Sequence, residues 1–371
     1  MRLVAALLVL VAVDALSGVA VVAPKRTSFA SEVVSWLVES EIAFGYDPTF
    51  GSAAAQEVTL GRATVRLCAS PQRAEDSGRA GASRRLTDAA VGGDVVHLHE
   101  DLWRSRGDIV RARLRARAGL LASRHFARKT RATRIDGLTA RAFLEEHHLY
   151  GAERCAHNYG LYDDEATLVA VAAFGKRRTV QRGGVSASSY HLSRFCARKD
   201  GNVVGGISKI AKHFARDVGD VDDITTEVDR DWGAGNDWSK LGFVVIQTMP
   251  PCAMCVGDDG KRRYLTGGAG LTAKPRDDTE WLLKLPEDVL AALDAAASPV
   301  ECLADAGYYQ VFDAGVTRLL LLVSDELKDA FDGSAVDAFA ATPEKFLDFY
   351  ASPNAGIATL LAAARNDMDR P

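Results

Sequence analysis

The sequence of 371 residues predicts an α/β fold of the α+β type, a mixed central sheet with flanking helices. Three observations support this prediction. Short strands with turns between them occur close together from residue 157 to residue 197, which favours antiparallel pairing. A strand, a glycine turn, a helix and another strand follow, an order typical of mixed sheets. The composition, 47% hydrophobic and 25% charged, is that of an ordinary globular protein.

The N-terminus carries an apolar run from Leu3 to Val13 after one early charge, Arg2. The run is too short to span a bilayer comfortably, and small residues follow it. We therefore expect residues 1–20 to be a secretory signal peptide, with a buried first helix or strand as the alternative. Six cysteines in so long a chain do not indicate a disulfide scaffold. A leader followed by a core with free thiols also fits a protein that reaches a plastid through the secretory route.

Residues 29–103 are expected to form a small α/β region. A helix is predicted first, with Val33, Val34, Leu37 and Val38 on one face. Two strands around Gly61 follow as a hairpin, and residues 71–93 are expected to be a loop because they are rich in Gly, Ser and charge. Residues 94–100 are expected to be a strand.

Residues 104–134 form a basic segment in a protein whose net charge is −4. The segment has eleven Lys or Arg residues and one acid, Asp108. Arginine binds phosphate bidentately, so this pattern favours electrostatic contact with a DNA or RNA backbone. A solvated basic helix is the alternative. The candidate contacts are Arg111, Arg113, Arg115, Arg117, Arg128 and Lys129.

Residues 135–322 are expected to form the larger α/β domain. Its turn NVVGGISK, Asn202–Lys209, precedes a helix with Ile207, Ile210, Ala211 and Phe214 on one face. Gly205 and Gly206 allow close backbone approach, and the free N–H groups of a helix N-terminus favour an anion. A plain strand-to-helix turn uses the same residues and is the alternative.

This order of elements, followed by GNDWSKLGF, resembles the GNAT superfamily of N-acyltransferases. Asn236, Leu241, Gly242 and Phe243 match the family's segment after the helix. The resemblance implies acetyl-CoA or another acyl-CoA as the donor, with its pyrophosphate at the glycine turn. The residues implied for the donor site are Asn202, Val203, Val204, Gly205, Gly206, Ser208, Lys209 and Asn236.

The segment FLEEHHLYG, Phe143–Gly151, and the NYGLY that follows it resemble Mom-like phage proteins, GNAT relatives that modify adenine in DNA. A more specific resemblance is to GNAT-like proteins of phages and large viruses. It covers residues 94–322 and includes Phe174-Gly175-Lys176, Arg194-Phe195-Cys196 and Asp229-Arg230-Asp231-Trp232. In those relatives the preceding region resembles a very-short-patch-repair-type endonuclease. Here Leu67 and Cys68 stand where an acid is expected, so we interpret the region as a degenerate, inactive nuclease.

Three positions depart from the usual GNAT pattern. Asn202 and Ile207 replace the residues that normally open and close the turn. Trp238 falls where a Tyr commonly protonates the leaving thiolate, and an indole N–H is no usable acid at neutral pH. The standard acid is therefore missing.

Acyl transfer to an amine needs a base for the amine proton. Alternation along residues 224–229 puts Thr225, Glu227 and Asp229 on one face, so Glu227 or Asp229 is the candidate base. His191 is a third candidate for the same cleft. The alternatives are that Asp229 forms a structural pair with Arg230 and that His191 is a hydrogen-bonded structural residue.

Two other functions were weighed against the acyltransferase. Trp238 and the degenerate N-terminal region favour a catalytically inactive nucleic-acid-binding protein. Pro251-Cys252-Ala253-Met254-Cys255 resembles the zinc motif of nucleotide deaminases, but no His or Cys in the chain has Glu two residues later, as those enzymes require. No metal site is predicted, a structural zinc site with Cys155 and His157 being the alternative. Residues 323–371 are expected to be an Ala-rich helical tail.

Overall fold

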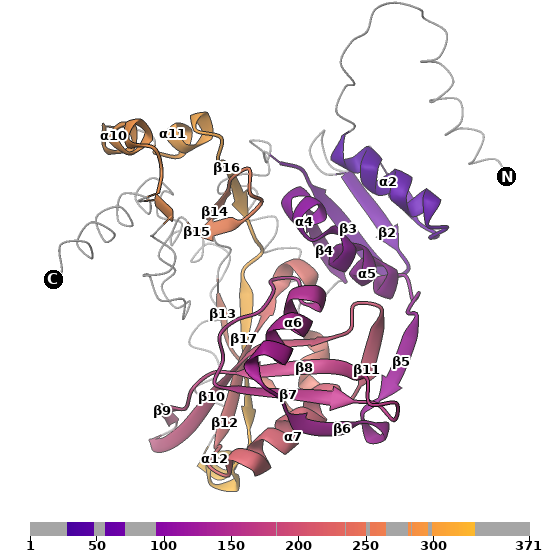
Figure 1. Cartoon of the computed structure of the whole chain (residues 1–371), viewed down its shortest axis with the longest axis vertical. Coiled ribbons are helices and arrows are strands. Elements are labelled where there is room, and N and C mark those ends of the chain that lie inside the picture. The colour runs from indigo at the N-terminus through magenta and orange to yellow at the C-terminus, as the bar shows by residue number, and fades with distance from the viewer. Residues whose placement is uncertain are drawn as a thin grey trace, which may run out of the picture.

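The computed structural model describes residues 28–47, 56–70, 94–182, 184–233, 235–249, 253–264, 281–282, 284–295 and 299–330. The predicted leader, the predicted loop at 71–93 and the tail after Ala330 lie outside the described residues. Figure 1 shows a small N-terminal unit above a large sheet, with a second small sheet beside them. The predicted fold class, a mixed α/β sheet with flanking helices, is confirmed.

The N-terminal unit is a four-stranded sheet in the order β1-β2-β3-β4. The predicted hairpin is present, because β2 and β3 pair antiparallel around Gly61, whose φ is 60°. β3 and β4 are parallel. The strands are β1 (Gly45–Asp47), β2 (Gln56–Leu60), β3 (Ala63–Cys68) and β4 (Val95–His99), and the helices are α2 (Phe29–Glu39), α4 (Glu100–Ser105) and α5 (Gly107–Arg117).

α2 buries a narrower face than its sequence predicts. Phe29, Ala30, Val33 and Leu37 are buried, whereas Val38 is 47% exposed. Each helical residue is rotated by about 100° from the last, so Val38 falls beyond the edge of a stripe centred on Val33 and Leu37. The basic helix α5 belongs to the same core, because Ile109, Val110 and Leu114 are buried in it.

The large sheet has eight strands in the order β13-β17-β12-β10-β8-β7-β6, with β9 paired to β10. Within it β10 and β12 are parallel, and the other recorded pairs are antiparallel. The strands are β6 (Arg131–Arg134), β7 (His157–Tyr162), β8 (Leu168–Phe174), β9 (Arg178–Arg182), β10 (Val185–Ala197), β12 (Asp223–Asp229), β13 (Val244–Met249) and β17 (Val316–Leu322).

Helices cover both faces of this sheet. β8 alternates: Ala170, Ala172 and Phe174 face one cluster, and Val171 and Ala173 face the other. On the first face α7 (Gly206–Val218) stacks Phe214 on Phe174, with ring centroids 4.0 Å apart. On the second face α6 (Gly137–His147) packs Phe143 and Leu144. A strand buried on both sides explains the continuous apolar run LVAVAAF.

Residues 201–204 differ from the expected turn. They form a short strand, β11 (Gly201–Val204), parallel to β5 (Ser123–Phe126). The reason is non-local: β5 lies almost 80 residues earlier and supplies backbone partners that local sequence does not reveal.

The small sheet is inserted between two neighbouring strands of the large sheet. After β13 the described residues form β14, β15, the helices α10 and α11, and β16, and the chain then returns as β17. Its order is β15-β14-β16, and β14 and β15 form an antiparallel hairpin after β13. The elements are β14 (Ala253–Val256), β15 (Arg262–Tyr264), α10 (Glu287–Ala295), α11 (Pro299–Asp305) and β16 (Tyr309–Phe312).

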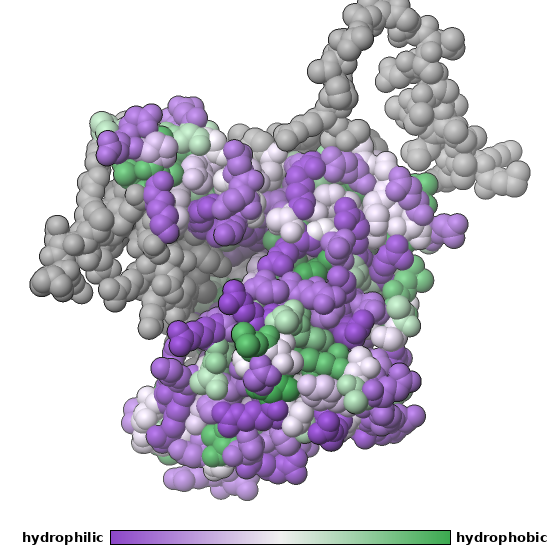
Figure 2. Space-filling model, in the orientation of Figure 1, coloured by the Kyte–Doolittle hydropathy of each residue, from purple (hydrophilic) through white to green (hydrophobic). Residues whose placement is uncertain are grey.

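The N-terminal unit is packed firmly onto the large sheet. Trp232, from the short helix η3 (Arg230–Trp232) after β12, and Leu149, after α6, are buried in the core of the N-terminal unit. Figure 2 shows that hydrophilic residues cover most of the visible face, with apolar residues in separate patches. Among the described residues, no helix combines the length and apolar character needed to cross a membrane.

Candidate functional site

A cleft of about 870 Å³ lies where β10, β12, η3 and α5 meet. Its walls include residues of α5, the loop after α6, β10, β12 with η3, the segment from Gly235 to Trp238, the small sheet and the start of β17. The cleft therefore lies between the N-terminal unit and the large sheet. We name it the central cleft.

The central cleft opens where two parallel strands part. β10 and β12 pair from Ser189–Asp223 to Leu192–Thr226. Beyond that point β10 stays paired with β8, and β12 stays paired with β17. A bulge at Ser193 bends β10 at the point of separation, and bulges commonly redirect strands beside functional sites. The facing edges of Ser193–Phe195 and Glu227–Asp229 both line the cleft.

All three predicted catalytic residues line the central cleft: His191 from β10, and Glu227 and Asp229 from β12. His191 Nδ1 lies 3.2 Å from Thr225 Oγ1 on the neighbouring strand. Burial lowers the pKa of His191, although Glu227 opposes the shift. Glu227 accepts hydrogen bonds from Arg318, with Nη2 2.7 Å from Oε1. Glu227 thus has a cationic partner that Asp229 lacks.

Asp229 has an environment suited to proton transfer. It is bonded to the Tyr150 hydroxyl, which donates to Oδ2, and to the N–H of Asp231, which donates to Oδ1 at 2.8 Å. Burial, and next the charge of Asp231, raise the pKa of Asp229 to about 6. A base with a pKa near the working pH is the most effective kind. The partner of Asp229 is Tyr150, and not Arg230.

A buried charged cluster lies directly behind Asp229. Asp231 is fully buried, with His99 Nε2 3.2 Å from one of its oxygens and His97 Nδ1 3.5 Å from the other. Arg262, from the small sheet, pairs with Asp101 at 2.7 Å and lies 3.9 Å from Asp231. Burial opposes ionisation of Asp231, but His99, His97 and Arg262 outweigh it and hold its pKa below the usual range. The cluster joins all three parts of the molecule.

The glycine turn lies beside the cleft rather than in its wall. Gly205 caps α7 with a φ of 77°, a conformation that suits glycine. A Cβ on Gly206 would lie 3.4 Å from the ring of Phe195. Phe195 itself lines the cleft, so the glycine turn lies next to a residue of the cleft wall. Asn202, Val204 and Gly205 are exposed, and Val203 and Gly206 are buried. Ser208 is half-buried, and Asn236 is the first residue of α8 (Asn236–Ser239).

Lys209 already has partners within the chain. Its Nζ donates to the carbonyl of Ala127 at 2.7 Å and to that of Thr130. These bonds tie the start of α7 to the short helix η2 (Ala127–Lys129). Lys209 therefore fixes the position of the glycine turn.

The predicted nucleic-acid residues do not form one exposed row. On α5, Arg111 lies over Trp103 at 4.5 Å and Arg115 over Trp36 at 5.8 Å, on the outside of the N-terminal unit. Arg113 and Arg117, on another side of the helix, line the central cleft. Arg128 and Lys129 are exposed on η2.

The described cysteines lie in apolar surroundings. Cys255 is buried in the core of the small sheet, whereas Cys155 packs beside α6. Burial raises the pKa of Cys255 and of Cys196 to about 12. Within the described ranges, no three His, Cys, Asp or Glu side chains gather as metal ligands do. Cys252 lies outside those ranges.

Sequence reasoning missed three cleft residues: His148, Tyr150 and Arg262. Tyr150 and His148 come from the loop after α6, and Arg262 comes from the small sheet. His148 and Tyr150 lie in the segment that resembles Mom-like proteins, but their place in the cleft, like that of Arg262, depends on neighbours far along the chain. Tyr150 is the most important omission, because its phenol is an acid in a cleft where Trp238 replaces the usual acidic tyrosine.

The chain matches no protein-family model and no curated protein. Acetyltransferases are among the solved structures to which it is similar. The Escherichia coli ribosomal-protein-S18-alanine N-acetyltransferase is 11% identical, over 53% of this chain and 94% of that one, with a TM-score of 0.26. The Vibrio cholerae spermidine/spermine N-acetyltransferase SpeG is 10% identical, over 55% of this chain and 98% of that one, with a TM-score of 0.29. A Bacillus subtilis acetyltransferase in complex with CoA is 12% identical, over 53% and 100%, at 0.26. Similarity at this level does not establish function, and the fold class rests on the strand order described above.

Proposed function

We propose that this chain is a GNAT-like acyltransferase that transfers an acyl group from acyl-coenzyme A to an amine. The observation that carries the proposal is the separation of β10 and β12, which opens the central cleft beside Asp229. An acyltransferase needs a slot for an extended thioester and a base for the amine at its end. The central cleft offers both.

The donor arm of coenzyme A fits the separated strands chemically. It is a flexible chain with amide groups, and the facing edges of β10 and β12 have backbone groups that no neighbouring strand pairs. Such edges bind extended ligands by adding a strand-like partner. The N–H groups at the start of α7, next to Phe195, favour the pyrophosphate. Gly205 and Gly206 would allow its close approach.

Asp229 is the proposed general base. The amine nitrogen attacks the thioester carbonyl, the carbon–sulfur bond breaks, and the amine proton passes to Asp229. The proton then has a route to the leaving sulfur through the Tyr150 hydroxyl, which would give its own proton to sulfur and take the one from Asp229. This relay would replace the tyrosine that is missing at Trp238. His191, uncharged because burial lowers its pKa, would line the acyl side of the cleft.

Thiol release from acetyl-CoA in the presence of a panel of amines tests the proposal. The parent chain should release thiol in an amine-dependent way. Asp229→Asn should lower kcat/KM by roughly 100-fold or more, since general bases contribute that much. Asp220→Asn is the matched control, because Asp220 lies outside the cleft and pairs with Arg177 at the surface. Equal rates in D229N and D220N would refute the role of Asp229.

For the N-terminal unit we propose a degenerate nuclease that has lost its chemistry and now supports the cleft. Its similarity to the nuclease-like region of viral GNAT-like proteins rests on the order of elements. Leu67 and Cys68, where an acid is expected, are buried. A purified chain that cleaved DNA in the presence of Mg²⁺ would contradict this proposal.

Nucleic-acid binding is a second candidate function, favoured by an exposed cluster around β5. Phe126 is 39% exposed, with Arg124 and Arg128 over its ring at 5.6 and 5.3 Å. Lys129 is exposed beside them. An exposed ring with guanidinium groups beside it suits a stacked base and a phosphate backbone. Neutralising Arg124, Arg128 and Lys129 together should weaken single-stranded DNA binding. The slope of the logarithm of the binding constant against the logarithm of the salt concentration should become shallower by about 2 to 3.

A further inference from the structure

Within the part of the chain that the structure describes, Arg113 differs from the other arginines of the central cleft because it forms no salt bridge with a carboxylate. Arg117 pairs with Asp94, Arg194 with Glu153 at 3.1 Å, and Arg262 with Asp101 at 2.7 Å. Among the described residues, the recorded neighbour of the Arg113 guanidinium is the ring of Trp232, 5.0 Å away. No Arg113 nitrogen is among the buried side-chain atoms without a partner, so its donors reach the solvent of the cleft, where a ligand could supply acceptors.

The wall around Arg113 is positively charged. His148 lies on the same wall, and its pKa is lowered to about 3 by burial and then by the charges of Arg194, Arg113 and Arg106. Its Nδ1 accepts the N–H of Tyr150 at 3.2 Å, which leaves Nε2 as a donor. Arg113 and His148 thus offer donors, and neither offers a negative charge.

The strand β12 gives the cleft an acidic side. Glu227 and Asp229 line it, and Asp229 is the proposed base for the amine. Burial lowers the pKa of Arg113, while its electrostatic interactions with Tyr150 and Asp229 oppose the shift, so Arg113 and Asp229 are close enough to interact. A ligand that spans this cleft would meet a carboxylate at one end and an unpaired guanidinium at the other.

We propose that Arg113 determines acceptor specificity, and that the acceptor is a small molecule that carries both an amine and an anionic group, a carboxylate or a phosphate. This inference rests on the proposed acyl transfer at the same cleft. The amine lies towards Asp229, and the anion lies against Arg113, which is held in place by the Trp232 ring. Arginine is the side chain best suited to bind such groups with two parallel hydrogen bonds. The N-terminal unit, through α5, thereby supplies part of the acceptor site.

Calorimetric titration of the full chain with matched pairs of amines tests the proposal. The pairs are β-alanine and propylamine, O-phosphoethanolamine and ethanolamine, and deoxyadenosine 5′-monophosphate and deoxyadenosine. They separate a carboxylate, an alkyl phosphate and a nucleotide as sources of the anion. In at least one pair the anionic member should bind roughly 10- to 100-fold more tightly, the usual effect of a charge-assisted hydrogen bond.

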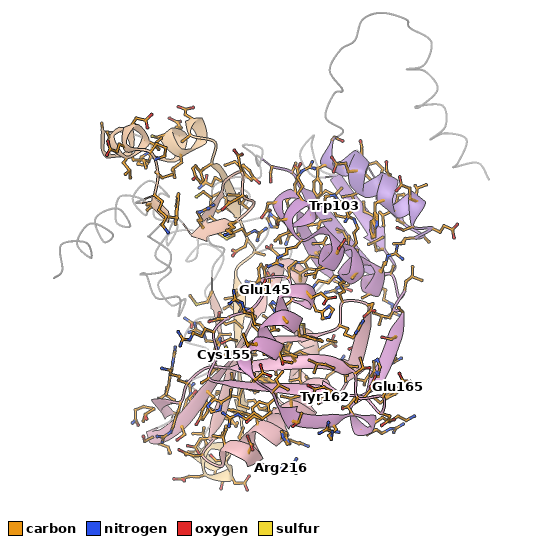
Figure 3. All side chains as sticks on the ribbon, viewed as in Figure 1. Trp103, Glu145, Cys155, Tyr162, Glu165 and Arg216 are labelled. Carbon is orange, nitrogen blue, oxygen red and sulfur yellow. The ribbon has the colours of Figure 1, made fainter. Side chains whose placement is uncertain are left out.

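Three variants test whether Arg113 causes the preference for the anionic member of a pair. Arg113→Gln should abolish the preference for the anionic member, and Arg113→Lys should keep part of it. Arg216→Gln, at the end of α7, should leave it unchanged; Figure 3 shows Arg216 at the end of the molecule opposite the N-terminal unit, where Trp103 is labelled. Because Arg113 has no carboxylate partner, R113Q should be at least as resistant to thermal unfolding as the parent.

Failure would take one of four forms. The proposal is overturned if no anionic member binds, if both members of every pair bind equally, if the preference survives in R113Q, or if R113Q is strongly destabilised. Coenzyme A titrated into the same samples separates this result from the proposed function. Anion preference without coenzyme A binding would leave the anion site standing and remove the acyltransferase.

Discussion

The Tyr150 hydroxyl donates a hydrogen bond to Oδ2 of Asp229, although 79 residues separate the two in the chain. Tyr150 comes from the loop after α6, which packs against the N-terminal unit, and Asp229 ends β12 in the large sheet. Burial, and next the charge of Asp229, raise the pKa of Tyr150 well above its ordinary value. The phenol therefore stays protonated and holds the carboxylate in one orientation.

The first prediction concerns the pH dependence of the parent chain. The pKa of Asp229 is raised to about 6, and only its ionised form accepts a proton. The kcat/KM for acyl transfer should therefore rise with pH and level off above about 6. A rate profile from pH 4.5 to 8.5 measures this. A flat profile through pH 6 would show that Asp229 is not the base.

Tyr150→Phe should shift this profile in a defined direction. The hydrogen bond from Tyr150 favours ionised Asp229, and its loss should raise the pKa of Asp229 further. The acid limb should move to higher pH, and the plateau rate should fall because the relay is broken. Tyr162→Phe is the matched control, since Tyr162 lies on β7 and outside the central cleft. An unchanged acid limb in Y150F would contradict the assigned contact.

Asp229→Asn should change stability in a way that depends on pH. The folded-state pKa of about 6 lies above the ordinary value of 3.8, so the folded chain binds the extra proton between them. The stabilising contribution of Asp229 is therefore present below pH 3.8 and lost as the pH rises through about 6. Relative to the parent, D229N should gain about 2.5 kcal/mol in unfolding free energy between pH 4 and pH 8. Urea unfolding at both pH values measures the difference, and a constant difference would refute the raised pKa.

Arg262→Gln should destabilise the fold. The substitution leaves Asp101 and Asp231, both buried, without their cation, and breaking such a buried pair costs about 3–5 kcal/mol. Arg263→Gln is the adjacent control, because its partner Asp259 is 42% exposed, and we expect a loss of about 1 kcal/mol. Equal losses in the two variants would show that the buried cluster does not hold the three parts together.

The sequence predicts much of the local structure for a physical reason. The amphipathic face of α7, the hairpin at Gly61 and the apolar strand β8 each follow from patterns within a dozen residues. The shared face of Glu227 and Asp229 follows from strand alternation in the same way.

The parts that sequence reasoning missed depend on distant neighbours. β11 becomes a strand because β5 pairs with it. Tyr150 meets Asp229, and Arg262 meets Asp101, only after three segments have packed together. Arg113 and Arg117 differ from Arg111 and Arg115 only in what lies opposite each side of α5. Composition correctly marks this helix as basic, but tertiary contacts decide which arginines line the cleft.

Calorimetric titration of the full chain with coenzyme A is the most direct test of donor binding at the glycine turn. Gly205→Asp and Gly205→Asn form a matched pair: both side chains tolerate the left-handed conformation of residue 205, and only aspartate places a negative charge at the start of α7. We expect the parent and G205N to bind coenzyme A. G205D should bind at least about tenfold more weakly, because its negative charge repels the phosphates. No binding by the parent, or equal binding by G205D and G205N, would contradict donor binding at the glycine turn.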